Sequence, residues 1–174
     1  MQPLRVNRDP TLLHPTFRRA LTQVLDQLKA EQIPFLLFEG FRYPERQADL
    51  YAQGRTKPGA IVTRALPWRS YHQFGLGADL VLFDNGAWSW DTAGPRAPWW
   101  ARMQALGREA GLAPLDFEKP HLQLAGLSSN DFADGVYPPA GDDDWSEHLA
   151  AVIAGWKGEP PAPPPPAIAV RPAL

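Results

Sequence analysis

The stretch Leu76-Gly77-Ala78-Asp79-Leu80-Val81-Leu82-Phe83 is the segment that says most about the fold. It is short and almost wholly apolar, which predicts a buried β-strand. Successive side chains of a strand alternate between its two faces, so every second residue from Leu76 lies on one apolar face and Asp79 lies on the other. A desolvated carboxylate without a partner is costly. We therefore expect a cation beside Asp79, either an arginine or a metal ion.

A second predicted strand, His121-Leu122-Gln123-Leu124, repeats this alternation. Its two leucines share the inward face, and His121 lies on the opposite face. If the two strands are neighbours in one sheet, Asp79 and His121 face the same cleft.

His72 precedes Asp79 by seven residues, with Gly75 and Gly77 between them. The glycines permit a turn that folds His72 back over the start of the strand. His72, Asp79 and His121 would then form a set of two histidines and one carboxylate with an open position. This arrangement is typical of hydrolytic zinc sites.

Glu118 lies three residues before His121, just ahead of Pro120. At that position it can lie over the metal as a general base without being a ligand. Spacing alone leaves plainer interpretations open, because a single histidine is usually a core or surface residue and a single strand aspartate usually pairs with arginine or lysine.

The other predicted elements follow from apolar spacing and from proline and glycine punctuation. Helices are expected at 15–30, 44–53, 98–110 and 145–156, and strands at 35–38 and 61–63. This succession predicts an α+β fold, a small single domain in which an antiparallel sheet has flanking helices.

Composition narrows the class of protein. The chain has 174 residues, enough for one core, and its formal net charge of −2 lacks the basic character of nucleic-acid binding. The absence of cysteine excludes disulfides and thiolate metal sites. No apolar run approaches the ~20 residues of a transmembrane helix, so we expect no membrane insertion. We also expect synthesis in the cytoplasm without a signal peptide.

The last part of the chain differs in composition. We expect a domain over 1–157 and a proline-rich tail over 158–174, extended or disordered, because Glu-Pro-Pro-Ala-Pro-Pro-Pro-Pro favours polyproline II. The run 142–144 of three aspartates is interpreted as the N-cap of the helix that begins near Trp145, rather than as a calcium site.

Other polar and aromatic residues are given plain interpretations. Arg64 and Arg69 are interpreted as solvated side chains. Neither His14 nor His148 is assigned a role. The tryptophans are expected mostly in the core, with a weaker alternative in which Trp68 and Trp88 line a saccharide- or peptide-binding rim.

Three longer motifs resemble a known family. They are Gly40-Phe41-Arg42-Tyr43-Pro44-Glu45-Arg46-Gln47, the run 50–63 that contains Gly54-Arg55-Thr56-Lys57-Pro58-Gly59, and Ser70-Tyr71-His72-Gln73-Phe74-Gly75-Leu76-Gly77-Ala78-Asp79. Together with Glu118 and His121, they resemble the zinc peptidases that cut peptidoglycan stem peptides. That family includes D-Ala-D-Ala carboxypeptidases and phage endolysin-like L-alanyl-D-glutamate endopeptidases. The similarity spans roughly 34–124 and implies a fold like that of D,D-peptidases and Hedgehog domains.

The resemblance also implies roles for individual residues. His72, Asp79 and His121 would bind Zn²⁺, and Glu118 would activate water. Arg42 matches an arginine that stabilises negative charge on the substrate or transition state.

Two further residues match the family less specifically. Ser70 matches a residue close to the metal shell, and Gln47 matches a helix residue near the cleft, both predicted to help bind substrate. The segment 111–117 lacks the tryptophan-rich run that the family usually carries there, a departure that concerns the substrate subsite.

The favoured hypothesis is an endolysin-like peptidase that cuts the L-Ala–D-Glu bond of the peptidoglycan stem peptide, reaching the wall through a holin or another export route. A D,D-carboxypeptidase or D-Ala-D-Ala dipeptidase is the first alternative. A non-catalytic zinc-containing module that binds the cell wall, comparable to the inactive Hedgehog domains, is the second. The oligomeric state is left open, with a monomer as the working expectation.

Overall fold

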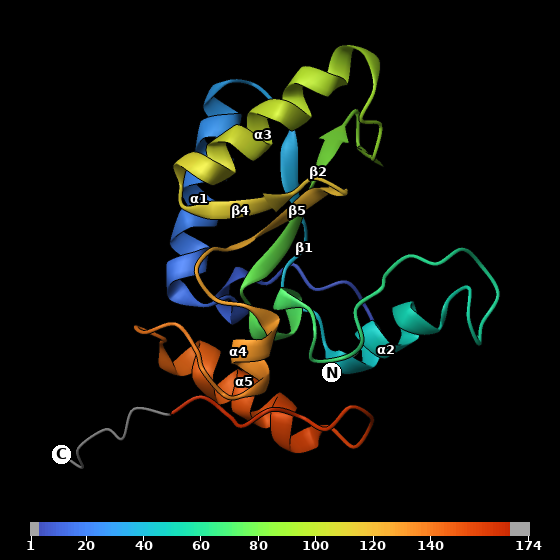
Figure 1. Ribbon diagram of the computed structural model, residues 1–174. Helices are drawn as coiled ribbons and strands as arrows, with labels where there is room; N and C mark the ends of the chain where they lie inside the picture. The colour runs from blue at the N-terminus through green and yellow to red at the C-terminus, as the bar shows by residue number, and fades with distance from the viewer. Residues whose placement is uncertain (1–3, 168–174) are drawn as a thin grey trace.

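In the computed structural model, which describes residues 4–167, the centre is a five-stranded sheet with every pairing antiparallel (Figure 1). Four strands follow the order β1-β2-β5-β4, and the short β3 pairs with the C-terminal end of β2. The strands are β1 (Phe35–Glu39), β2 (Gly77–Asp84), β3 (Ala87–Ser89), β4 (Leu112–Leu115) and β5 (Glu118–Leu124).

Helices cover the sheet and one of its ends. α1 and α3 contact each other, and between them they contact β1, β4 and β5 (Figure 1). α4 and α5 lie together at the end of the sheet where β2 begins (Figure 1). The helices are α1 (Pro15–Ala30), α2 (Pro44–Ala52), α3 (Ala97–Glu109), α4 (Ser129–Ala133) and α5 (Asp143–Gly155), with 3₁₀ turns η1 (Pro10–Leu12), η2 (Tyr71–Phe74) and η3 (Gly94–Arg96).

α1 shows why the local pattern predicts the fold well. Phe17, Leu21, Val24 and Leu28 recur at helical spacing, and each is at most 2% exposed. Burying such side chains contributes about 1.5–3 kcal/mol each before the entropy cost of ordering the chain. The predicted range 15–30 is confirmed, as is the α+β class with its antiparallel sheet.

The register of β2 places charged residues side by side. Asp79 pairs with Glu39 of β1 on one side and with His121 of β5 on the other. Directly paired residues of antiparallel strands point to the same face of the sheet. The predicted adjacency of the Asp79 and His121 strands is therefore confirmed, and Glu39 joins the same row.

Two predictions about strands are wrong. The segment 61–63 is not a strand: it is loop, and Ile61 is 56% exposed and Val62 55%. β-branched residues favour strands only when a neighbouring strand is there to pair with, and no pairing of this segment occurs among residues 4–167. Conversely, β4 was not expected, because it contains Pro114, which is tolerated only since β4 is an edge strand.

The tryptophan-rim alternative is wrong for Trp68. Trp68 is 2% exposed and packs against Phe74 and Trp156 in the core. Trp88 is half-buried, in edge contact with Phe38. Trp68 therefore belongs to the core, and the alternative for Trp88 stays a prediction.

The C-terminal part of the fold bears on two predictions. Asp142 caps α5 by accepting a hydrogen bond from the backbone N–H of Trp145 at 2.9 Å, as expected. The described part of the proline-rich tail, 158–167, has no helix or strand, and Pro163 and Pro166 are buried. The boundary at residue 157 stays a prediction, and 168–174 lie outside the described residues.

Within 4–167, no helix has both the length and the apolar character needed to cross a membrane.

Candidate metal centre

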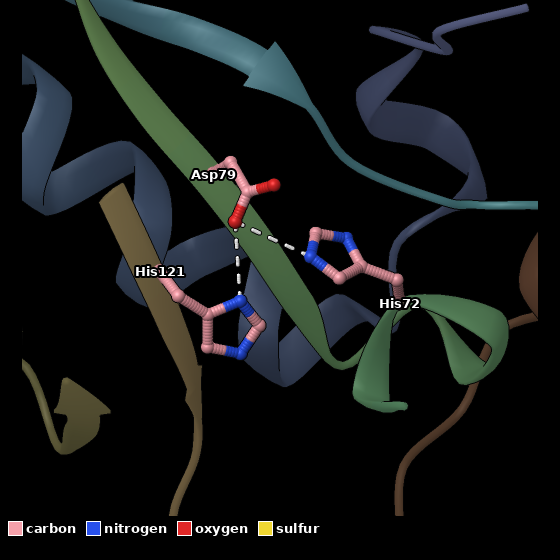
Figure 2. A group of neighbouring side chains, drawn as sticks. All are labelled: His72, Asp79 and His121. Atoms are coloured by element: carbon pink, nitrogen blue, oxygen red, sulfur yellow. Dashed lines mark hydrogen bonds and ion pairs between the residues drawn. The ribbon is translucent and has the colours of Figure 1, made fainter. Parts of the chain in front are cut away.

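Three side chains that are far apart in the sequence converge where β2, β5 and η2 meet (Figure 2). One ligand atom from each of His72, Asp79 and His121 lies within 4.8 Å of the others. The Asp79 Oδ1 atom lies 3.3 Å from His72 Nε2 and 3.1 Å from His121 Nδ1. All three residues are at most 9% exposed.

Two glycines make this convergence sterically possible. Gly75 ends η2 with a φ of 65°, in the left-handed region that favours glycine. A Cβ on Gly77 would lie 2.9 Å from the Tyr71 Cβ and 3.1 Å from the His121 Cε1. The chain can therefore return from η2 into β2 close to His121, and the predicted role of these glycines agrees with the structure.

A backbone contact fixes the orientation of the His72 ring. His72 Nδ1 lies 2.7 Å from the carbonyl oxygen of Gly40. Because a carbonyl oxygen only accepts hydrogen bonds, Nδ1 carries the proton and Nε2 presents its lone pair to the centre. The Nε2 atom is buried and makes no hydrogen bond.

Arg42 is the cation expected beside Asp79. Its Nη2 donates to Asp79 Oδ2 at 3.2 Å and to Glu39 Oε2 at 2.7 Å. Burial opposes the positive charge, but the carboxylates of Glu39 and Asp79 outweigh it and raise the pKa of Arg42. Burial likewise acts to raise the pKa of Asp79, and the neighbouring imidazoles of His72 and His121 outweigh it and hold that pKa well below its usual value. Asp79 is therefore a carboxylate at neutral pH.

Glu39 is a functional candidate that sequence reasoning missed. It is 2% exposed, and its carboxylate also accepts a hydrogen bond from Arg46 Nε at 2.5 Å. Burial acts to raise its pKa, but Arg42 and Arg46 lower it below the ordinary value. The signal was present, because Glu39 ends an apolar strand and two arginines follow within seven residues.

A chain of amides supports Arg42 from behind. Gln47 Oε1 accepts from Arg42 Nη1 at 3.1 Å and from Gln73 Nε2 at 3.2 Å. Gln73 Oε1 in turn accepts from the backbone N–H of Ser70 at 3.1 Å. Gln47 is fully buried and supports Arg42 and the loop 63–65, and its predicted part in substrate binding stays a prediction.

The three convergent side chains lie at a cleft of about 1030 Å³. His72 and His121 form part of its lining, together with Arg42 and Ser70. The loop 61–65 and Arg69 also line the cleft, as do Phe117 and Glu118, which are both exposed. Of the residues predicted to act in chemistry, Glu118 and Arg42 therefore share one cleft with the histidines.

Comparison with known proteins identifies the family. The VanY family, described as D-alanyl-D-alanine carboxypeptidase, matches residues 10–131. The chain belongs to the VanY family. The match includes all three convergent residues and Glu118, and it confirms the resemblance drawn from the motifs.

Individual relatives of this VanY-family chain act on different bonds. Over 87 residues it is 42% identical to the peptidoglycan L-alanyl-D-glutamate endopeptidase CwlK of Bacillus subtilis, an alignment that covers 47% of the chain and 50% of CwlK. The chain thus matches about half the length of that curated relative. The LdcB LD-carboxypeptidase has a similar fold, with a TM-score of 0.51 at 21% identity, over 66% of this chain and 59% of that one. The L-Ala D-Glu endopeptidase ChiX of Serratia marcescens gives a TM-score of 0.49 at 23% identity, over 71% of this chain and 89% of ChiX.

Proposed function

We propose that the chain is a zinc-dependent peptidase that hydrolyses the L-Ala–D-Glu bond of peptidoglycan stem peptides. The observation that carries the proposal is the convergence of His72, Asp79 and His121 beside a cleft that both histidines and Glu118 line. The bond specificity rests on the 42% identity to CwlK. The proposed place of action is the cell wall.

The donor set fits zinc. Two imidazoles and one carboxylate leave one position of a tetrahedral site open, as catalytic zinc requires. The buried His72 Nε2 has no hydrogen-bond partner and presents its lone pair, which is the state of a histidine ready to ligate. Bound zinc would supply a Lewis acid that polarises a peptide carbonyl and makes water more acidic.

The chain's own residues supply the proton transfers and the charge stabilisation. The exposed Glu118 carboxylate takes a proton from the attacking water and returns it to the amine that leaves. The buried Arg42 guanidinium lines the cleft with its Nε free of hydrogen bonds, and it stabilises the negative charge that develops on the carbonyl oxygen. Glu39 and Gln47 hold this guanidinium in place before substrate arrives.

A carboxypeptidase is the second candidate, favoured by the description of the VanY family itself. The two candidates differ in product: an endopeptidase frees the amino group of D-glutamate, whereas a carboxypeptidase releases a terminal D-alanine. A non-catalytic wall-binding module is less well supported, because a binding role gives no reason for Glu118 to line the cleft beside the histidines.

Mass spectrometry of purified peptidoglycan, digested with the zinc-loaded chain, tests the proposal. We expect a new free amino group on D-glutamate with the wild type and none with Glu118→Ala. Release of D-alanine would assign the chain to the carboxypeptidase branch. Binding to peptidoglycan without any product, from protein shown to contain zinc, would favour the wall-binding module.

A further inference from the structure

The charge of the cleft is strongly asymmetric. Four arginines line it, and Glu118 is the carboxylate in its lining: the arginines are Arg42, Arg55, Arg64 and Arg69. A cleft lined mainly by one sign of charge attracts ligands of the opposite sign. The cationic residues thus suggest that the ligand carries a carboxylate.

Two of the four arginines are each held by several contacts. Arg42 is bound by Glu39, Asp79 and Gln47. Arg55 donates to the carbonyl oxygen of Thr63 at 3.1 Å and stacks 3.9 Å from the centre of the Tyr51 ring. These two guanidinium groups are used to hold the site together.

The other two arginines lie on the exposed wall. Arg69 makes one bond at 3.3 Å, to Asn130 Oδ1. Arg64 is exposed and makes no hydrogen bond or ion pair with any residue in 4–167. Its charge is therefore available to a ligand.

The residues on both sides of Arg64 are held by hydrogen bonds, whereas the Arg64 side chain is free. Thr63 Oγ1 and the Ala65 carbonyl oxygen both accept from the buried Gln47 Nε2, at 3.2 and 2.8 Å. The residues on both sides of Arg64 are therefore tied to α2. Because the backbone is already held, binding a ligand orders only the Arg64 side chain, which limits the entropy cost of binding.

The turn between β4 and β5 contributes apolar residues to the lining of the same cleft. Phe117 is 86% exposed there, beside the half-buried Leu115. A peptide lying in the cleft can place apolar groups against Phe117 and carboxylates toward Arg64. The cleft can thus fix the direction in which a peptide lies.

We propose that Arg64 binds a free carboxylate of the peptide substrate beside the bond that is cut. This inference rests on the proposed function, in which D-glutamate follows that bond. When D-glutamate is linked to the next residue through its side chain, its α-carboxylate stays free. Arg64 would distinguish this acid from the corresponding amide, D-isoglutamine.

The kinetic test uses two synthetic stem peptides that differ only in having D-glutamate or D-isoglutamine. We expect the zinc-loaded wild type to prefer the acid by about fivefold in kcat/KM, the upper range for an exposed ion pair. The preference should appear in KM. It should vanish in Arg64→Gln, persist partly in Arg64→Lys and be unchanged in Arg108→Gln, whose exposed arginine lies outside the cleft. Equal cleavage of both peptides by the wild type would overturn the inference.

A binding measurement separates this inference from the proposed function. Calorimetry with Glu118→Gln, alone and combined with Arg64→Gln, follows binding of the same two peptides without turnover. Tighter binding of the acid that depends on Arg64 supports the inference, even if the wild type cuts neither peptide. Failure of the wild type to cut either peptide would refute the proposed bond specificity instead. Equal binding of both peptides, or equal losses for both in Arg64→Gln, would overturn the inference.

Discussion

Glu39 and Asp79 bind the same atom, the Nη2 of Arg42, at 2.7 and 3.2 Å. The two carboxylates are register partners across β1 and β2, so the sheet itself sets their separation. Like charges this close would repel each other, and the shared guanidinium removes that cost. Arg42 therefore couples Glu39 to the carboxylate of Asp79, which lies beside the two imidazoles.

Replacing Glu39 by glutamine should strongly destabilise the fold. The change keeps the shape but leaves the buried Arg42 and the half-buried Arg46 with less negative charge, and breaking a buried pair costs about 3–5 kcal/mol. Urea unfolding measures this loss. Glu31→Gln is the matched control, because Glu31 pairs with Arg102 at the surface and its loss should matter far less. Equal, small losses for both variants would show that the Glu39 network contributes little.

The ligand assignment predicts that His72→Ala loses zinc. Metal analysis after dialysis should give about one ion per chain in the wild type and almost none in the variant, since a three-ligand site cannot retain zinc with two ligands. His148→Gln removes another histidine with a buried ring nitrogen, away from the cleft, and should keep its zinc. Full zinc content in His72→Ala would refute the assignment.

Glu118→Gln should separate catalysis from metal binding. Loss of a general base lowers kcat by about 10²–10⁴-fold. Zinc content and urea stability should stay close to wild type, because the Glu118 side chain is exposed. Glu147→Gln, an exposed change on α5, is the control and should keep full activity. A variant at position 118 that retains wild-type turnover would remove Glu118 from the mechanism.

The part of the site that sequence predicts best is the part governed by local rules. Alternation within β2 and the cost of burying a charge are enough to expect a cation at Asp79. The pairing of β2 with β5 was conditional, because no local pattern specifies which strands are neighbours. Glu39 was missed for the same reason: its importance follows from the β1–β2 register, although its arginine neighbours gave a clue.

The cleft wall shows where local reasoning fails. Ile61 and Val62 have strand propensity, yet the chain there forms a loop held by Gln47 and Arg55. Such side-chain bonds to the backbone leave no periodic signature in the sequence. Arg64 was accordingly interpreted as a solvated residue, and only the folded chain places it over the cleft.

Removing the proline-rich tail after residue 157 should destabilise the domain. Trp156 Nε1 donates to the Pro160 carbonyl oxygen at 2.8 Å, and the Tyr137 hydroxyl donates to that of Pro164 at 2.6 Å. Each bond contributes about 1 kcal/mol, and exposing the aromatic rings adds to the loss. A chain ending at residue 167 keeps both bonds and is the control in urea unfolding. Identical stability of the two truncated chains would show that the tail is dispensable.

The buried His14 and the half-buried His148 predict that stability falls in mild acid. Burial lowers the pKa of His14 and of His148 below the ordinary 6.5. His14 Nδ1 also accepts the backbone N–H of Thr16 at 3.2 Å, a cap on α1 that a protonated ring cannot provide.

The sign of the effect follows from proton binding. The unfolded chain binds protons at these histidines near pH 6.5, whereas the folded chain binds them only at lower pH. Their contribution to stability is therefore complete above pH 6.5 and is lost as pH falls through the lowered pKa values. Urea unfolding from about pH 7.5 to about pH 5, with a chelator present so that zinc does not contribute, measures the loss. His14→Asn keeps an acceptor at the cap but does not titrate, so the difference between it and the wild type isolates His14 from the carboxylates. A parallel decline of the two proteins below pH 6.5 would contradict the prediction for this residue.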